Sequence, residues 1–154
     1  MSGGVTVRPA RASDRDVIAA FNVAMGRETE GRELDPEVLR SGVEKALADS
    51  SRGRYLVAEL DGAVAGCLFV TREWSDWHDA WYWWIQSVYT APEARGRGVY
   101  TALHGQVRRE ATAAGDVAAI RLYVERHNTR AQGTYRKLGM VDSDYRVYEE
   151  RLDG

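Results

Sequence analysis

The chain has 154 residues, of which 44% are hydrophobic and 29% charged, the size and balance of one compact domain spanning residues 1–154. A formal net charge of −2 argues against a broad electrostatic surface for nucleic acid or acidic lipids. No apolar run approaches the ~20 residues of a membrane span, and the first residues lack the pattern of a secretory signal. We therefore expect a cytoplasmic protein whose partner is a small molecule.

The cysteine and histidine content excludes two further classes of site. The single cysteine, Cys67, cannot form an internal disulfide, and it lies in an apolar run that indicates a core residue and not a nucleophile. Three scattered histidines offer no ligand set spaced for a metal. We expect no metal cofactor.

The first fifty residues predict a short strand and two helices. Residues 5–7 alternate between apolar and polar, and Ser13 followed by Asp16 resembles the capping box that starts a helix. Asp35 at the cap and Pro36 at the first helical position predict the second helix. An acidic turn is expected between the two helices.

Three strands are predicted in the middle of the chain. Residues 55–60 and 64–70 are strand-like runs joined by Asp61 and Gly62, a pair that tolerates the positive φ angles of a tight hairpin turn. Residues 81–90 are aromatic and β-branched, and the run stops just before a proline. An antiparallel hairpin followed by a third strand is the result.

All five tryptophans fall within eleven residues, from position 74 to position 84. Side chains alternate along a strand, so Trp81 and Trp83 should face one way, and Tyr82 and Trp84 the other. One set can enter a single core, and the other should meet a helix, a substrate or a second subunit. A substrate wall, a homodimer surface and plain core packing are all compatible with this pattern.

A glycine-rich loop opens the last third of the chain. Residues 95–98 (Arg-Gly-Arg-Gly) lead directly into a helix whose apolar residues recur every four positions. Residues 120–124 alternate as a strand, and Asn128 caps a further helix that ends at Gly139. Residues 145–152 are predicted as a closing strand. The whole order predicts one α/β domain with a mixed sheet.

This loop suits a phosphate group, because a helix N-terminus presents unpaired backbone N–H groups and partial positive charge. The donors would be those of Gly96, Arg97, Gly98, Val99 and Tyr100. The glycines let a phosphate approach the amides, and the arginines add positive charge. The loop matches neither the dinucleotide-binding fingerprint nor a Walker loop. An ordinary strand-to-helix turn is the alternative.

Two motifs carry a resemblance to a known family. They are Val88-Tyr89-Thr90, Ala91-Pro92-Glu93-Ala94 and Arg95-Gly96-Arg97-Gly98-Val99, followed later by Asn128-Thr129-Arg130-Ala131-Gln132 with Tyr135, Leu138, Gly139 and Met140. In this order they resemble the GNAT superfamily of N-acetyltransferases. The resemblance implies a three-layer α/β domain with a mixed, mostly antiparallel sheet of six to seven strands, about four flanking helices and splayed central strands.

The resemblance also implies a site for acetyl-coenzyme A as co-substrate. In the family, the pattern Arg/Gln-x-x-Gly-x-Gly/Ala cradles the pyrophosphate; Arg95 and Gly98 match, whereas Tyr100 stands where glycine or alanine is usual. Val88 and Thr90 would bind the pantetheine arm through their backbone, where their strand splays from its parallel neighbour. The implied cofactor-binding residues are Val88, Tyr89, Thr90, Arg95, Gly96, Arg97, Gly98, Val99, Tyr100, Thr101, Asn128 and Tyr135.

The implied reaction is direct acetyl transfer to a primary amine of a small molecule. The backbone N–H of Val88 is the implied oxyanion donor, and Tyr135 matches the tyrosine that gives a proton to the coenzyme A sulfur. A phenol of pKa about 10 can protonate a thiolate of pKa about 8.5 at a cost of ~2 kcal/mol. Asn128 matches a pantetheine contact, a role compatible with its helix cap.

The acceptor side is defined only by chemistry. Early carboxylates and aromatic faces would suit a cationic or aromatic amine, with Glu28, Trp81, Trp83 and Gln86 as candidate acceptor-binding residues. No residue is singled out as the general base, and deprotonation through water is one route. A non-catalytic acyl-coenzyme A sensor or recruiting module, and a transferase for a longer acyl group, are the alternatives.

Overall fold

The computed structural model describes residues 4–153, which form two compact units, one that ends at Tyr123 and one that begins at Val124. In chain order the elements are β1 (Thr6–Pro9), η1 (Ala12–Asp14), α1 (Arg15–Glu30), α2 (Pro36–Ala48), β2 (Arg54–Leu60), β3 (Ala63–Ser75), β4 (Ala80–Thr90), η2 (Pro92–Ala94), α3 (Val99–Ala114), β5 (Val117–Leu122) and α4 (Thr129–Lys137). Within the described residues, no helix combines the length and the apolar character needed to cross a membrane.

A mixed sheet in the order β1-β2-β3-β4-β5 forms the centre of the first unit. Strands β1 to β4 pair antiparallel, and β5 runs parallel to β4. Asp61 and Gly62, with φ angles of 54° and 80°, form the tight turn between β2 and β3, which confirms the predicted hairpin. Consecutive strands therefore lie side by side. The chain passes from β1 to β2 through α1 and α2, and from β4 to the parallel strand β5 through α3.

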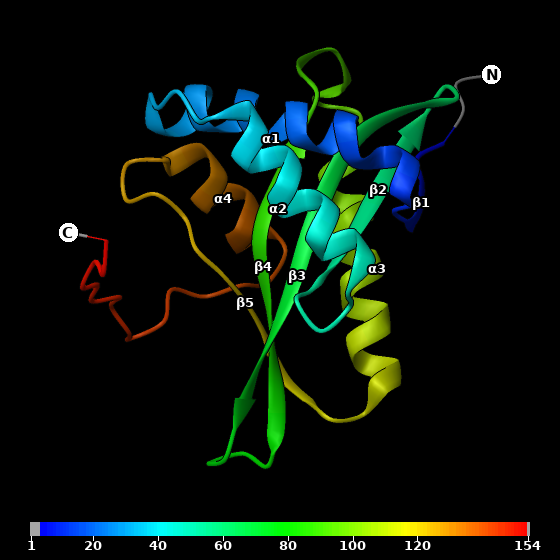
Figure 1. Ribbon diagram of the computed structural model, residues 1–154. Coiled ribbons are helices and arrows are strands. Elements are labelled where there is room, and N and C mark those ends of the chain that lie inside the picture. The colour runs from blue at the N-terminus through cyan, green and yellow to red at the C-terminus, as the bar shows by residue number, and fades with distance from the viewer. Residues whose placement is uncertain (1–3, 154) are drawn as a thin grey trace. The chain divides into compact units, whose positions relative to one another are not determined.

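Helices cover both faces of this sheet, with α1 and α2 on one face and α3 on the other (Figure 1). Alternation along β2 explains the two cores: Leu56 and Ala58 pack with Leu103 of α3, whereas Val57 packs with Ile18 of α1. The sheet is buried on both sides for this reason. The predicted three-layer α/β arrangement is confirmed.

Cys67 belongs to the core on the α1 face, as predicted. Its side chain is 1% exposed, and burial raises the pKa of its thiol to about 12. A thiol that stays protonated in an apolar layer is inert as a nucleophile.

The start of α1 differs from the prediction. Ser13 lies within the turn η1 and does not cap α1, which begins two residues later at Arg15. The buried Asp14 accepts hydrogen bonds from Arg8 of β1, at 2.8 and 3.1 Å, and from the backbone N–H of Arg11 at 2.7 Å. The guanidinium of Arg8 holds the pKa of Asp14 below its usual value. An ion pair between β1 and η1, six positions apart in the sequence, thus holds the residue that directly precedes the helix.

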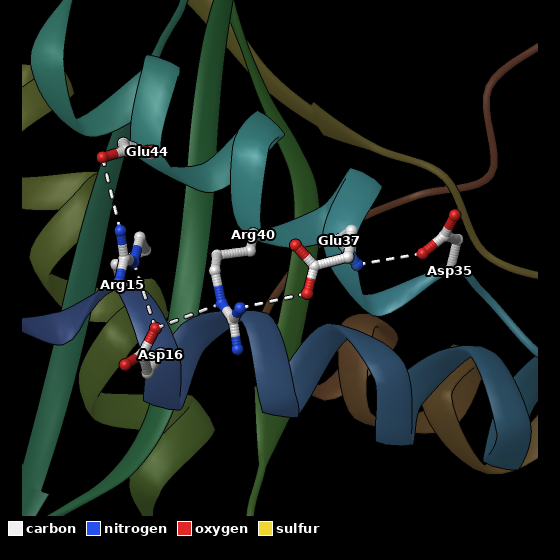
Figure 2. Close-up of polar contacts among 6 residues, drawn as sticks. All are labelled: Arg15, Asp16, Asp35, Glu37, Arg40 and Glu44. Carbon is white, nitrogen blue, oxygen red and sulfur yellow. Dashed lines mark hydrogen bonds and ion pairs between the residues drawn. The ribbon is translucent and has the colours of Figure 1, made fainter.

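The second helix begins as predicted, since the Asp35 side chain accepts from the backbone N–H of Glu37 at 3.0 Å. Figure 2 shows that Arg40 of α2 reaches both Glu37, at 3.1 Å, and Asp16 of α1, at 3.5 Å. These ion pairs are exposed, so each is worth about 0–1 kcal/mol. The contact between the helices therefore depends mainly on the apolar side that α2 buries, centred on Val43.

The second unit contains α4 and a long irregular segment. The Asn128 side chain accepts from the backbone N–H of Ala131 at 3.1 Å, and the chain leaves the helix through Gly139 at φ 90°. Both predicted helix boundaries are confirmed. The closing strand predicted for residues 145–152 is wrong, because these residues have no strand partner in the structure. Residues 4–153 therefore form five strands instead of six to seven, since an alternating pattern makes a strand only where a neighbour pairs with it.

Gly66 provides a test of the packing between β3, β4 and α3. A Cβ at this position would lie 2.8 Å from the Tyr89 carbonyl oxygen and 2.8 Å from Cγ1 of Val99. We expect Gly66→Ala to lower the free energy of unfolding by about 1–3 kcal/mol in a denaturant titration. Gly42→Ala, in the middle of α2 where a Cβ meets nothing within 4 Å, is the control and should raise it by up to ~1 kcal/mol. Equal effects of the two changes would contradict the close packing at Gly66.

Candidate functional site

A β-bulge at Gln86 divides β4 into two parts. In the ladder with β3, Val70 lies opposite Ile85, but its neighbour Phe69 lies opposite Ser87. Gln86 is therefore an extra residue on β4, and its side chain donates to the Thr71 hydroxyl at 2.9 Å. The uniform alternation of residues 81–90 gave no sign of this bulge.

The bulge reverses which side chains face which layer. Before it, Trp83 and Ile85 pack in the core beneath α3; after it, Val88 takes that side and Tyr89 enters the core beneath α1. A single extra residue shifts the two-residue period of a strand by one position. Tyr89 reaches the α1 face for this reason.

The two central strands separate just beyond the bulge. Pairing between β4 and β5 ends at Ile85 and Leu122, whereas β4 continues to Thr90. Among the described residues, no strand pairs with this last part of β4 on the side that β5 has left. The predicted splay of the central strands is confirmed.

Backbone groups face this free edge in a regular alternation. The N–H of Ala91 donates to the carbonyl of Ala65 on the β3 side at 2.8 Å. Successive residues of a strand point their N–H and C=O groups to opposite sides. Val88 and Thr90, at odd spacings from Ala91, therefore direct these groups toward the free edge. They are the two residues predicted to bind through their backbone.

The glycine loop follows directly on this edge. Gly96 and Gly98 have φ angles of 79° and 83°, in the left-handed region where a side chain is strained. A Cβ at either position would meet no protein atom within 4 Å, so the space beside the loop is open. Helix α3 begins at the buried Val99, and its first turn has N–H groups without an intrahelical carbonyl. The loop can therefore receive a phosphate group.

Each arginine of the loop is paired with a carboxylate from another element. Arg95 donates from Nη2 to Oε1 of Glu28 on α1 at 2.7 Å, and from Nε to the carbonyl of Thr90 at 3.2 Å. Arg97 donates to Asp61, in the turn between β2 and β3, at 3.3 Å. The structure brings Glu28, predicted on the acceptor side, together with Arg95, predicted on the cofactor side.

Tyr89 completes the contact around Glu28. Its hydroxyl donates to the second carboxylate oxygen of Glu28, and the Arg95 guanidinium lies 5.5 Å from the centroid of its ring. The hydroxyl of Tyr89 and the guanidinium of Arg95 hold the pKa of Glu28 below its ordinary value. Burial and the adjacent carboxylate raise the pKa of Tyr89 to about 12. At neutral pH, Glu28 is charged and Tyr89 is not.

The two tryptophans predicted on the acceptor side lie on the α3 face of the sheet. Trp83 is 8% exposed and belongs to the core, and Trp81 packs against the same core. Arginines cover both rings: Arg54 lies 5.4 Å from the Trp83 centroid and Arg72 lies 4.5 Å from that of Trp81. The positions of Trp81 and Trp83 are those of residues that pack in the core.

Tyr82 and Trp84 occupy the opposite face, as the alternation predicted. The guanidinium of Arg121 lies 3.5 Å from the Tyr82 centroid, and Tyr123 stacks on Trp84 at 4.6 Å. The indole N–H of Trp84 donates to Glu73 at 2.8 Å. The aromatic faces of Tyr82 and Trp84, of the kind expected to attract a cationic ligand, thus already contact Arg121 of this chain. Sequence analysis missed Arg121. It lies on β5, and only the pairing of β5 with β4 brings it beside Tyr82.

A family model described as "Acetyltransferase (GNAT) family" matches residues 19–140. The protein belongs to the GNAT acetyltransferase family. Its fold is the GNAT fold, and the strand-to-loop-to-helix segment described above lies inside the matched region. Among curated proteins, none matches this sequence at a significant level.

Solved structures share this GNAT fold over nearly the full chain. A structure described as "a possible acetyltransferase from Clostridium difficile 630" is 38% identical, with a TM-score of 0.90, over 97% of this chain and 99% of the other. An aminoglycoside N-acetyltransferase in complex with CoA is 15% identical, with a TM-score of 0.80, over 99% and 97%. The ribosomal-protein-alanine N-acetyltransferase of Brucella melitensis biovar Abortus 2308 is 16% identical, with a TM-score of 0.76, over 97% and 100%. At these low identities, the last two structures show only that this chain shares their fold.

Tyr100 is the position at which this GNAT sequence departs from the family pattern. Its hydroxyl lies 3.0 Å from Nδ1 of His104, one turn further along α3. Burial, with a smaller effect of Arg108, lowers the pKa of His104. The sequence analysis did not single out this buried histidine, although its spacing of four residues from Tyr100 places the two on one helix face.

The remaining GNAT motif residues lie in the second unit. Asn128 caps α4, and Tyr135 lies on the same helix seven residues later. The backbone carbonyl of Tyr135 accepts from Leu138 at 3.1 Å and from Met140 at 3.0 Å, which closes the end of the helix. Contact of Asn128 with pantetheine and proton donation by Tyr135 stay predictions. Among residues 4–153, no three His, Cys, Asp or Glu side chains are grouped so as to hold a metal ion.

The contacts of Glu28 predict a pH dependence of stability. Because the folded state lowers the pKa of this carboxyl, the stabilisation is fully present above the unfolded pKa of about 4.3 and is lost as the pH falls through the folded value. We expect wild type to exceed Glu28→Gln in free energy of unfolding at pH 6–7, and the difference to shrink below about pH 4.3. Denaturant titrations from pH 7 to pH 3 measure it, and a difference that is constant over this range would contradict the pairing.

Proposed function

We propose that this GNAT protein transfers an acetyl group from acetyl-coenzyme A to a primary amine of a small molecule. The observation that carries the proposal is the free edge of β4 beyond Ile85, which leads directly into the left-handed glycines before α3. A strand edge without a neighbouring strand, followed by a helix N-terminus, suits a ligand with an amide-containing arm and a phosphate group. Coenzyme A has both parts.

The first unit would hold the coenzyme through its backbone. Val88 and Thr90 would pair with the pantetheine arm, and the loop at Gly96 and Gly98 would receive the pyrophosphate. The complex of a structural neighbour with CoA supports this choice of ligand. The other residues proposed for the cofactor site are Tyr89, Arg95, Arg97, Val99, Tyr100, Thr101, Asn128 and Tyr135.

Direct attack requires few groups from the protein. The acceptor amine must be neutral and held against the thioester carbonyl, where the N–H of Val88 would stabilise the oxyanion that forms. When the carbon–sulfur bond breaks, Tyr135 would give its proton to the departing thiolate. The amine proton would leave through water, because Glu28 is already held by Tyr89 and Arg95 and is a weak base.

The proposal of a small amine as acceptor rests on the chemistry of the side chains and not on the fold. The structural neighbours include an aminoglycoside N-acetyltransferase and a ribosomal-protein-alanine N-acetyltransferase, so one fold serves both small and protein acceptors. The sequence has no basic docking segment, which favours a small acceptor over a protein. Gln86 and Glu28, on the α1 side of β4, are the residues we assign to a small acceptor.

Tyr135→Phe tests the reaction. Thiol release with a panel of amines should fall by about 10²-fold or more in kcat, with the KM for acetyl-coenzyme A nearly unchanged. Tyr148→Phe is the control, because Tyr148 is an exposed tyrosine of the same unit, and it should leave the rate unchanged. Full activity of Tyr135→Phe would remove the proposed acid.

Gly98→Ala tests the cofactor loop. Both Gly98 and Gly115 have left-handed backbones, at the two ends of α3, and a Cβ at either meets open space. Alanine should therefore lower the stability by about 1–2 kcal/mol at each position. Only Gly98→Ala should weaken coenzyme A binding in calorimetry, by tenfold or more. Equal binding by both variants would contradict the site.

The same assays separate the alternatives. Coenzyme A binding without thiol release for any amine would favour a sensor or recruiting module. Faster release from a longer acyl-coenzyme A than from acetyl-coenzyme A would identify a different acyl donor.

A further inference from the structure

The positive charge of the cofactor loop is already compensated within the protein. Arg95 pairs with Glu28 at 2.7 Å and Arg97 pairs with Asp61 at 3.3 Å. The two carboxylates come from α1 and from the turn between β2 and β3, far from the loop in sequence. An anion that arrives at the loop therefore meets arginines that already have partners.

Arg95 also occupies part of the free edge of β4. Its Nε donates to the carbonyl of Thr90, one of the backbone groups that point toward the open side. Glu28 fixes Arg95 in this position from the last turn of α1, and the hydroxyl of Tyr89 orients the carboxylate through its other oxygen. Arg95 must change partners before it can contact a pyrophosphate.

We propose that Glu28 and Asp61 are internal counter-ions of Arg95 and Arg97, which the pyrophosphate of coenzyme A displaces when it binds. The inference rests on the proposed function. The side chains of Glu28 and Arg95 are 38% and 43% exposed, so water and salt screen their attraction. A diphosphate that also accepts from backbone N–H groups can replace such a partner.

The counter-ions lower the affinity of the loop for anions. While the site is empty, each carboxylate stabilises its arginine, and that stabilisation is lost on binding. A ligand held by charge alone gains little from the exchange, whereas one that also pairs with the edge of β4 still binds. Glu28 and Asp61 would therefore act as specificity-determining residues of the cofactor site.

Neutral variants test the proposal in the full-length protein. By calorimetry, Glu28→Gln should bind coenzyme A about three- to tenfold more tightly than wild type. It should gain equally for dephospho-coenzyme A, which keeps the pyrophosphate, and gain nothing for pantetheine, which lacks it. Asp61→Asn should show a smaller gain in the same direction, because its ion pair is longer. Asparagine tolerates the left-handed backbone at position 61, so this second variant should fold.

Glu44→Gln is the matched control. Glu44 also pairs with an arginine of another element, Arg15, at 3.3 Å (Figure 2). Arg15 lies ~20 Å from Glu28 along α1, and Glu44→Gln should leave the affinity unchanged. In an Arg95→Gln background, Glu28→Gln should no longer increase the affinity, because the partner of the carboxylate is gone.

The outcomes separate the two proposals. If wild type does not bind coenzyme A, the proposed function fails and this inference fails with it. If wild type binds but neither Glu28→Gln nor Asp61→Asn binds more tightly, the inference alone is overturned. Weaker binding by Glu28→Gln would show that Glu28 instead holds Arg95 ready for the pyrophosphate. If Glu28→Gln still increases the affinity in the Arg95→Gln background, the gain is a general charge effect. That result would also overturn the inference that Glu28 acts through Arg95.

Discussion

The extra residue at Gln86 is the constraint on which the candidate site depends. It lets β4 keep its pairing with β3 while it changes the direction of every later side chain and backbone group. Tyr89 reaches α1 because of this change, and the backbone of Val88 and Thr90 faces the edge that β5 has left. Without the bulge, the residues next to Val88 and Thr90 in the sequence would direct their N–H groups to that edge instead. Tyr89 would then point away from Glu28.

The role proposed for the loop before α3 imposes two opposing requirements. Binding a pyrophosphate favours several donors and positive charges at one point, but the same charges repel one another when no ligand is present. Pairing Arg95 with Glu28 and Arg97 with Asp61 removes the repulsion, and the glycines keep the backbone open on the ligand side. Helix α1 and the turn between β2 and β3 are thereby linked to the glycine loop by the side chains of Glu28 and Asp61.

Sequence analysis succeeded where the signal is local. The Asp61-Gly62 turn, the cap at Asp35, the cap at Asn128 and the glycine loop each depend on a few adjacent residues, and all lie where predicted. It failed where contacts between different elements decide. The residue before α1, Asp14, is held by Arg8 of β1. Glu28 and Arg95 lie 67 positions apart, and the bulge in β4 is visible only in its pairing with β3. Residues 145–152 have an alternating pattern but no pairing strand, which a pattern alone does not reveal.

The tryptophans of the β3–β4 hairpin make the fluorescence of the protein specific to its first unit. All five lie between positions 74 and 84, in the first unit, and the second unit has none. Indole emission therefore reports the state of one hairpin, whereas circular dichroism reports the helices of both units. Coincidence of the two signals during unfolding would mean that the units melt as one cooperative body, and separation would mean that α4 can unfold while the sheet stays intact.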